Sequence, residues 1–192
     1  SDSCDQCHSV RPRTAWNEQE ARLTARTTEL GVACESCHGP ARAHVEHYQN
    51  PINRYAARLG RADTVHIVNP ARLDHERSSA VCGNCHGELV FPGKKVDSSW
   101  QPGERLEDHI NVVQLQAPPF PKWLENTLKD EPDLLDSAFW KDGTMRVAGR
   151  DYNAMSLSGC YTRGEMSCTS CHQLHGAPPN DLLKNPKDED AA

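Results

Sequence analysis

The apolar positions of this chain fall into short groups with helical spacing, separated by segments that contain proline and glycine. These groups, together with two serines that precede a cysteine pair, predict a series of short helices. The predicted helices cover residues 16–30, 41–48, 71–77, 121–128 and 132–142, together with a helix that Ser78 or Ser79 caps and that runs into residues 82–86.

Turn-forming residues set the ends of several helices. Gly31 is placed to end the first helix, and Pro40 suits the first turn of the second. Ser167 can cap one more short helix, over residues 168–172. Between the helices, residues 65–68 predict a brief strand or an extended loop, residues 88–118 a loop and residues 144–152 an extended segment. The predicted fold class is therefore mainly α, with extensive loops and a low content of regular secondary structure.

Eight of the nine cysteines lie in four copies of one pentapeptide, in which two cysteines three positions apart are followed directly by histidine. This is the attachment signature of a c-type haem, because the two cysteines add across the porphyrin vinyl groups and the histidine ligates the iron. The predicted attachment residues are Cys4, Cys7, Cys34, Cys37, Cys82, Cys85, Cys168 and Cys171, and the predicted proximal ligands are His8, His38, His86 and His172. We therefore expect four haem c groups.

Three other interpretations of the cysteines fit less well. Structural zinc would need two CxxC pairs roughly 15–20 residues apart, and the first three pairs here are farther apart than that. A disulfide framework does not require a histidine after each pair. A thioredoxin-like redox site would accompany a βαβ pattern, which this chain does not show. The repeated histidine therefore favours haem over zinc and disulfides.

The composition agrees with an interior built partly from porphyrin. Only 36% of the 192 residues are hydrophobic, below the roughly 45–50% of an ordinary globular domain. Four covalently held porphyrins would add large apolar surfaces, so we expect a haem-packed multihaem cytochrome c. Residues 1–176 are predicted to form one tetrahaem domain, and residues 177–192 a polar C-terminal tail.

The charge pattern excludes two classes of partner. The formal net charge is −6, and the porphyrin propionates would make the loaded protein more negative. The chain has no basic patch with interleaved aromatic residues, so we expect no nucleic-acid partner. It also has no apolar run long enough to cross a membrane, which predicts no transmembrane segment.

Six of the ten histidines lie outside the four motifs and are candidates for the second axial ligand of each iron. His175 lies one helical turn after His172, on the proximal side of its own haem, so we expect it to ligate a neighbouring iron. The same argument applies to His44, six positions after His38. Such cross-ligation would bring porphyrins close together, as electron transfer requires.

The other four histidines are ranked by their surroundings. His109 and His66 lie beside apolar residues, where a buried imidazole needs a partner, and either iron or a core hydrogen bond would supply one. His75 lies in a charged stretch, which favours a solvated surface position over ligation. His47 competes with His44 for one helix face. Cys160 is outside the motifs, and we expect a small buried residue near the fourth haem rather than an intermolecular disulfide.

Several segments resemble the multihaem c-type cytochromes of the tetrahaem and doubled-CxxCH families. They are residues 31–40 with His44, residues 79–87, and the run from residues 139–143 through 152–153 to 166–168, so the resemblance covers most of residues 29–176. It implies electron transport by bound haem c. In similar proteins this block follows another haem-binding segment, so the chain is interpreted as a trimmed fragment or a compact stand-alone relative. Similar small tetrahaem cytochromes polymerise into extracellular filaments, which implies a homopolymer as one form of assembly.

The expected function is electron transfer through four haems that are mostly ligated by two histidines, with redox proteins or neighbouring cytochrome subunits as partners. Covalent attachment takes place outside the inner membrane, so we expect a periplasmic or extracellular protein with an export signal. The alternative is an oxidoreductase module that acts on a small nitrogen or sulfur oxyanion, which needs an open distal position. Six spare histidines for four irons favour the electron carrier over the enzyme.

Overall fold

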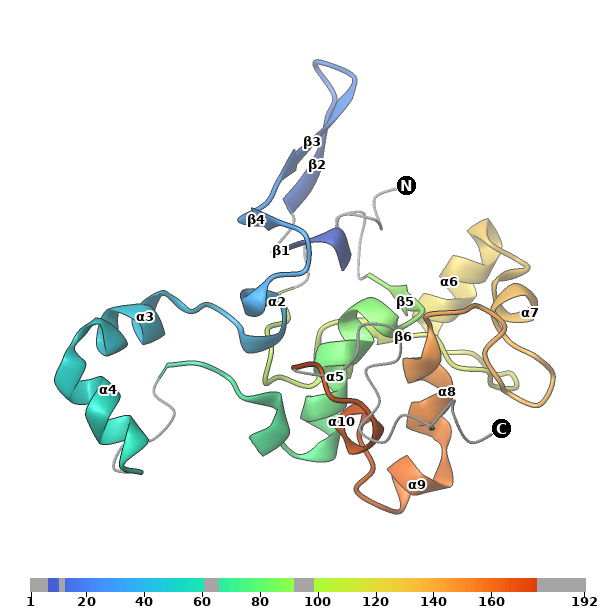
Figure 1. Ribbon diagram of the computed structural model, residues 1–192. Helices are drawn as coiled ribbons and strands as arrows, with labels where there is room; N and C mark the ends of the chain where they lie inside the picture. The colour runs from blue at the N-terminus through green and yellow to red at the C-terminus, as the bar shows by residue number, and fades with distance from the viewer. Residues whose placement is uncertain (1–6, 11–12, 61–65, 92–98, 176–192) are drawn as a thin grey trace, which may run out of the picture.

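The computed structural model describes residues 7–10, 13–60, 66–91 and 99–175, and it confirms a mainly α fold with extensive loops (Figure 1). The strands are short: β1 Ser9–Val10, β2 Arg13–Asn17, β3 Arg22–Arg26, β4 Glu29–Leu30, β5 Leu89–Val90 and β6 Asn111–Val112. The helices are α2 Cys34–His38, α3 Arg42–Gln49, α4 Pro51–Arg58, α5 His75–His86, α6 Lys122–Asp130, α7 Leu134–Ala138, α8 Asp151–Leu157, α9 Gly159–Thr162 and α10 Cys168–Cys171, with 3-10 turns η1 Pro70–Arg72 and η2 Leu106–Asp108.

The helix predicted over residues 16–30 is wrong, because this segment folds as a β-hairpin. Strands β2 and β3 pair in antiparallel register, with Trp16 opposite Leu23, and the hairpin extends away from the helices (Figure 1). Asn17 closes the turn, since its Oδ1 accepts hydrogen bonds from the backbone N–H groups of Gln19 and Glu20. An asparagine that bonds to the backbone two and three positions ahead offers the chain an alternative to a helix.

The two helices predicted between residues 71 and 86 are also wrong in their boundaries. A 3-10 turn over residues 70–72 comes first, and α5 then runs without a break to His86. Its N-cap is Asp74, whose carboxylate accepts a hydrogen bond of 2.9 Å from the Arg77 N–H. Ser78 and Ser79 lie inside the helix and are buried, so neither is the cap. An aspartate at the N-cap position accepts a hydrogen bond from a free N–H group of the first helical turn, as a serine at that position would.

Helices α3 and α4 form a hairpin that lies apart from α5 and the later helices (Figure 1). The predicted helix over residues 41–48 is confirmed as α3. Helix α4 was not predicted, although Asn50 and Pro51 give it a standard beginning: the Asn50 side chain accepts from the Ile52 N–H at 3.0 Å, and Pro51 occupies the first turn. Residues 61–65, which include part of the predicted strand or loop, lie outside the described residues.

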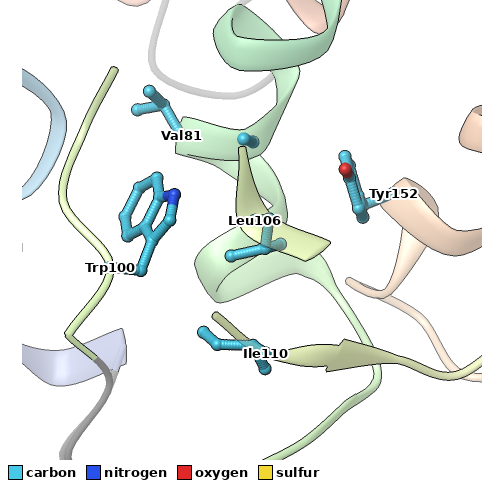
Figure 2. Close-up of a cluster of buried hydrophobic side chains, with 6 residues drawn as sticks. Val81, Trp100, Leu106, Ile110 and Tyr152 are labelled. Carbon is cyan, nitrogen blue, oxygen red and sulfur yellow. The ribbon is translucent and has the colours of Figure 1, made fainter. Parts of the chain in front are cut away.

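One cluster of buried side chains surrounds α5. Its members are Ala80, Val81, Trp100, Leu106, Ile110 and Tyr152. Figure 2 shows Leu106 between Trp100 and Tyr152, with Ile110 below it in that view. The thiol-bearing residue Cys37 of the second motif packs against the same cluster. The apolar contacts therefore hold the third motif, which forms the end of α5, against the rest of the chain.

A second cluster joins the loop after β6 to α6 and α7. It consists of Val113, Leu124, Leu134, Ala138 and Phe139. The helix predicted to begin at Pro121 is confirmed as α6, and the next one is shorter than predicted because it ends at Ala138. The segment predicted to be extended contains a bridge between Phe139 and Met145, but α8 begins at Asp151 inside it.

Candidate haem-attachment site

Each motif that the structure describes in full places its two thiols one helical turn apart. The second motif is α2, the third is the last turn of α5, and the fourth begins α10. The Ser167 N–H donates to Ser170 Oγ at 3.0 Å, which supports the predicted role of Ser167 at the start of α10. In a helix, residues three and four positions apart lie on one face, so in α2 and α5 both thiols and the following histidine lie on the same side. In the fourth motif, α10 ends at Cys171 and His172 is an extended C-cap.

The four motifs converge on α5. Cys7 of the first motif lies against the third motif, with its Sγ 3.6 Å from the carbonyl oxygen of Cys85. The Cys168 N–H of the fourth motif donates to Ser79 Oγ of α5 at 3.4 Å. Cys37 of the second motif packs on the core cluster around α5. One helix therefore brings together thiols that are far apart in the sequence.

Hydrogen bonds between thiols shift the pKa values in both pairs. The hydrogen bond with Cys85 lowers the pKa of Cys7 to about 6, and the positive charge of Arg150 acts in the same direction. The pKa of Cys85 is raised by the same hydrogen bond and by burial. In the other pair, the hydrogen bond with Cys82 lowers the pKa of Cys168 to about 7. A lower pKa increases the fraction of thiolate, which is the nucleophilic form.

Two residues that the motif search does not single out fix the third motif. The Arg150 Nη1 donates to the Cys85 carbonyl at 2.9 Å, and Arg150 also lies 3.5 Å from the Glu88 carboxylate. The ring of Tyr152 covers Gly83, so that a Cβ at position 83 would lie 2.7 Å from the ring. The Tyr152 hydroxyl donates to Glu107 at 2.7 Å. Sequence reasoning had no signal for these contacts, because they come from α8 and η2.

His38 is oriented for metal binding. Its Nδ1 lies 2.7 Å from the carbonyl oxygen of Val68, so Nδ1 carries the proton and Nε2 is left with a free lone pair. Histidines that ligate metals commonly make this second hydrogen bond, which fixes the ring and its tautomer. The ring of His175 lies 6.2 Å from the His38 ring, with an angle of 18° between the planes. The structure thus brings His175 to the second motif.

The remaining candidate ligands have other neighbours. The rings of His44 and His47 lie 4.7 and 4.8 Å from the ring of Tyr48, and His47 is 6.1 Å from His66. His66 has a φ of 66°, a left-handed conformation that is uncommon outside glycine.

His75 and His109 contact groups other than histidine. The His75 ring meets the ring of Tyr161 edge-on at 4.8 Å. His109 Nδ1 is 2.9 Å from Ser99 Oγ, and its Nε2 is 3.3 Å from the Glu104 carboxylate. Ligation of iron by His109 would therefore require it to release one of these two partners.

The ninth cysteine differs from its prediction. Cys160 is exposed, so the prediction of a small buried residue is wrong. It follows the start of the short helix α9, whose N-cap is Ser158, and its carbonyl accepts from the Met166 N–H at 3.4 Å. This contact places its backbone close to the fourth motif, in agreement with the other half of the prediction. Cys4 of the first motif lies outside the described residues.

A small polar cavity of about 230 Å³ adjoins the fourth motif. It is lined by residues of η1, the start of α5 and the segment around α10: Pro70, Ala71, Leu73, Asp74, His75, Ser78, Glu165, Ser167 and Thr169. Two of these side chains are carboxylates, and none is lysine or arginine. The cavity therefore has an acidic lining.

The described residues fit haem c. Every described cysteine carries a free thiol, the motif thiols lie at the one-turn spacing that two vinyl groups require, and the His38 tautomer leaves Nε2 free for iron. A mainly α, loop-rich fold whose helical turns carry these motifs defines a c-type cytochrome. The sequence model of the cytochrome c552 family matches residues 10–173, and the chain belongs to that family. Neither curated proteins nor solved structures give a match.

Proposed function

We propose that this c-type cytochrome is an electron-transfer protein that holds four haem c groups, one at each motif. The observation that carries the proposal is the convergence of the motifs on α5, where Cys7 contacts the Cys85 carbonyl and the Cys168 N–H contacts Ser79. Haem c supplies the redox couple, since its iron alternates between the ferric and ferrous states. Motifs that pack against one helix would hold their cofactors as neighbours, which short-range electron transfer requires.

We propose His38 and His175 as the two axial ligands at the second motif. The support is their proximity, since the two imidazole rings lie 6.2 Å apart and could hold one haem iron between them. The hydrogen bond from His38 to Val68 holds the proximal ring in place. Ligation by both residues would leave no open position for a substrate, as expected of an electron carrier.

The other axial positions are assigned by sequence position and surroundings. We propose His8, His86 and His172 as proximal ligands, because each follows its cysteine pair directly. His44, His109 and His66 are proposed as distal ligands, and His75 and His47 as the alternatives to them.

The cavity beside the fourth motif has a lining that disfavours an oxyanion. A nitrogen or sulfur oxyanion is negatively charged, and enzymes bind such substrates with cationic side chains or backbone N–H groups. Here the lining contains Asp74 and Glu165. Like charges would raise the free energy of the bound anion, so this cavity is a poor substrate site. Assays of turnover with nitrite, hydroxylamine and sulfite test this point directly.

We further propose that the protein works outside the cytoplasm, in the periplasm or at the cell exterior, as a link between redox proteins or as a subunit of a polymer. The support is chemical, because covalent haem attachment takes place on the outer side of the inner membrane. None of the helices in the described part of the chain is long and apolar enough to cross a bilayer. Sedimentation velocity at several concentrations separates a monomeric link from a polymer subunit.

The decisive experiment is intact-mass spectrometry combined with electron paramagnetic resonance on the purified red protein. We expect a mass equal to the polypeptide plus four haems, with low-spin ferric signals from all of them. Carbon monoxide should leave the spectrum of the reduced protein unchanged. A mass increase of fewer than four haems would contradict the haem count, and a high-spin haem that binds carbon monoxide would support the enzyme instead.

A further inference from the structure

Helix α4 carries an apolar stripe that no other part of the described chain covers. Ile52, Tyr55 and Leu59 follow one another at helical spacing and are 74%, 67% and 69% exposed. Large apolar side chains are normal singly on a protein surface, but three on one face form a patch that indicates an interaction site. The hairpin of α3 and α4 lies apart from the body of the protein, so the stripe is accessible (Figure 1).

The exposed face of α4 also carries cationic side chains, beside the apolar stripe. Arg54 and Arg58 are both exposed, and at 100° per residue they lie next to the apolar stripe on the solvent side of the helix. The inner side faces α3, since Asn53 donates to the His47 carbonyl at 2.8 Å and Ala56 and Ala57 are half-buried. The segment Pro51–Arg58 contains no aspartate or glutamate, although the whole chain has a net charge of −6.

The size and charge of this face distinguish between two possible binding partners, a second copy of the chain and a membrane surface. Complete coverage of the three apolar side chains would bury roughly 400 Å², about half of what each partner contributes to a standard protein–protein interface. A second copy of the chain is therefore a weak candidate. A helix with an apolar edge and an arginine edge is typical of segments that lie in the headgroup region of a bilayer, where the apolar side chains insert and the arginines meet anionic lipids.

We propose that α4 docks this protein reversibly on a membrane surface that contains anionic phospholipids. Ile52, Tyr55 and Leu59 enter the boundary between headgroups and acyl chains, while Arg54 and Arg58 pair with lipid phosphates. The proposal goes beyond electron transfer and does not depend on it, because it concerns where the protein resides rather than how many haems it holds. One short helix gives weak binding that salt and small changes in lipid composition reverse.

The test is flotation of the haem-loaded full chain with vesicles of phosphatidylglycerol and phosphatidylethanolamine, with phosphatidylcholine vesicles for comparison. We expect binding to the anionic vesicles only, and a loss of that binding at about 1 M salt, where charges are screened within a few ångströms. The double variant Ile52→Ser with Leu59→Ser should reduce the bound fraction at least about tenfold. The variant Arg54→Glu with Arg58→Glu should abolish the preference for anionic lipid.

Matched controls carry the same chemical changes elsewhere on the surface. Val147→Ser with Leu157→Ser removes two apolar side chains that are 41% and 44% exposed, and Lys122→Glu with Lys141→Glu makes the same change of charge. Both should bind like the unchanged protein. Absence of binding by the unchanged protein in low salt overturns the proposal, and so does equal loss in the controls. A Soret spectrum altered by Ile52→Ser with Leu59→Ser, without vesicle binding, would show that a haem covers the stripe instead.

Discussion

The imidazole rings of His38 and His175 lie 6.2 Å apart although the two residues belong to different motifs. His38 follows the second cysteine pair, and His175 lies three positions after the proximal histidine of the fourth motif. The contact joins the two motifs directly. If both rings bind one iron, the segment that carries the fourth haem is also held by the second.

Replacement of His175 tests this relationship. His175→Ala should leave four haems attached and convert one of them to a high-spin form that binds carbon monoxide, because its iron loses a strong-field ligand. Electron paramagnetic resonance and carbon monoxide difference spectra measure the change. The control is Leu174→Ala, which removes a neighbouring side chain that is 49% exposed. Four low-spin haems in His175→Ala would exclude His175 as a ligand.

The contact between Gly83 and Tyr152 predicts that a methyl group added at position 83 lowers the stability of the protein. In Gly83→Ala the new Cβ would lie 2.7 Å from the tyrosine ring, and the resulting overpacking should lower the free energy of unfolding by about 1–3 kcal/mol. Urea denaturation followed by circular dichroism measures the loss. In a Tyr152→Leu background the same substitution should cost less, since a smaller side chain leaves room for the methyl group. Strictly additive effects of the two substitutions would contradict direct contact.

Features of the fold and the site could be predicted from the sequence when they depend on residues that are close together in the chain. The helix that begins after Pro121 is a local feature, and its prediction is confirmed. The hairpin of β2 and β3 differs from the predicted helix because antiparallel pairing between two strands is not visible in a search for helical spacing. At the site, the pairing of His38 with His175 and the cover that Tyr152 gives Gly83 join distant segments. Residue order alone does not specify them.

Asn153 provides a prediction about the packing that supports α8. It is fully buried, and its side chain accepts from the Glu88 N–H at 2.7 Å and donates to the carbonyls of Glu88 and Val113 at 3.0 and 2.5 Å. Asn153→Ala removes the acceptor of the Glu88 N–H and a donor to the Val113 carbonyl, while the Glu88 carbonyl keeps the Val113 N–H, so the free energy of unfolding should fall by about 2–4 kcal/mol. Asn126→Ala is the matched control, because Asn126 is exposed and bonds only to the flexible Lys129 side chain. Equal effects would show that the buried contacts contribute little.

The N-cap residue of α5, Asp74, yields a prediction about stability and its dependence on pH. Asp74→Ala should destabilise the protein by about 1 kcal/mol, because the N–H of Arg77 loses its acceptor, whereas Asp74→Asn should retain most of the stability. The pKa of Asp74 is lowered mainly by this hydrogen bond. The contribution of the cap is therefore present above the ordinary aspartate pKa of 3.8 and is lost as the pH falls through the lower folded-state pKa. Thermal unfolding at pH 7 and at acidic pH measures both effects.

Substitution of cysteines inside and outside the motifs should have different effects on the number of attached haems. Cys160 lies on α9 and is exposed, outside any pair, so Cys160→Ser should keep the full mass increase from haem and the same absorption spectrum. In contrast, Cys168→Ser with Cys171→Ser removes both thiols of the fourth motif and should reduce the covalent mass by one haem. It should also change the surroundings of Cys82, whose thiol shares a hydrogen bond with Cys168. Retention of all four haems in the double variant would contradict attachment at this motif. Loss of a haem in Cys160→Ser would contradict the expectation that Cys160 takes no part in attachment.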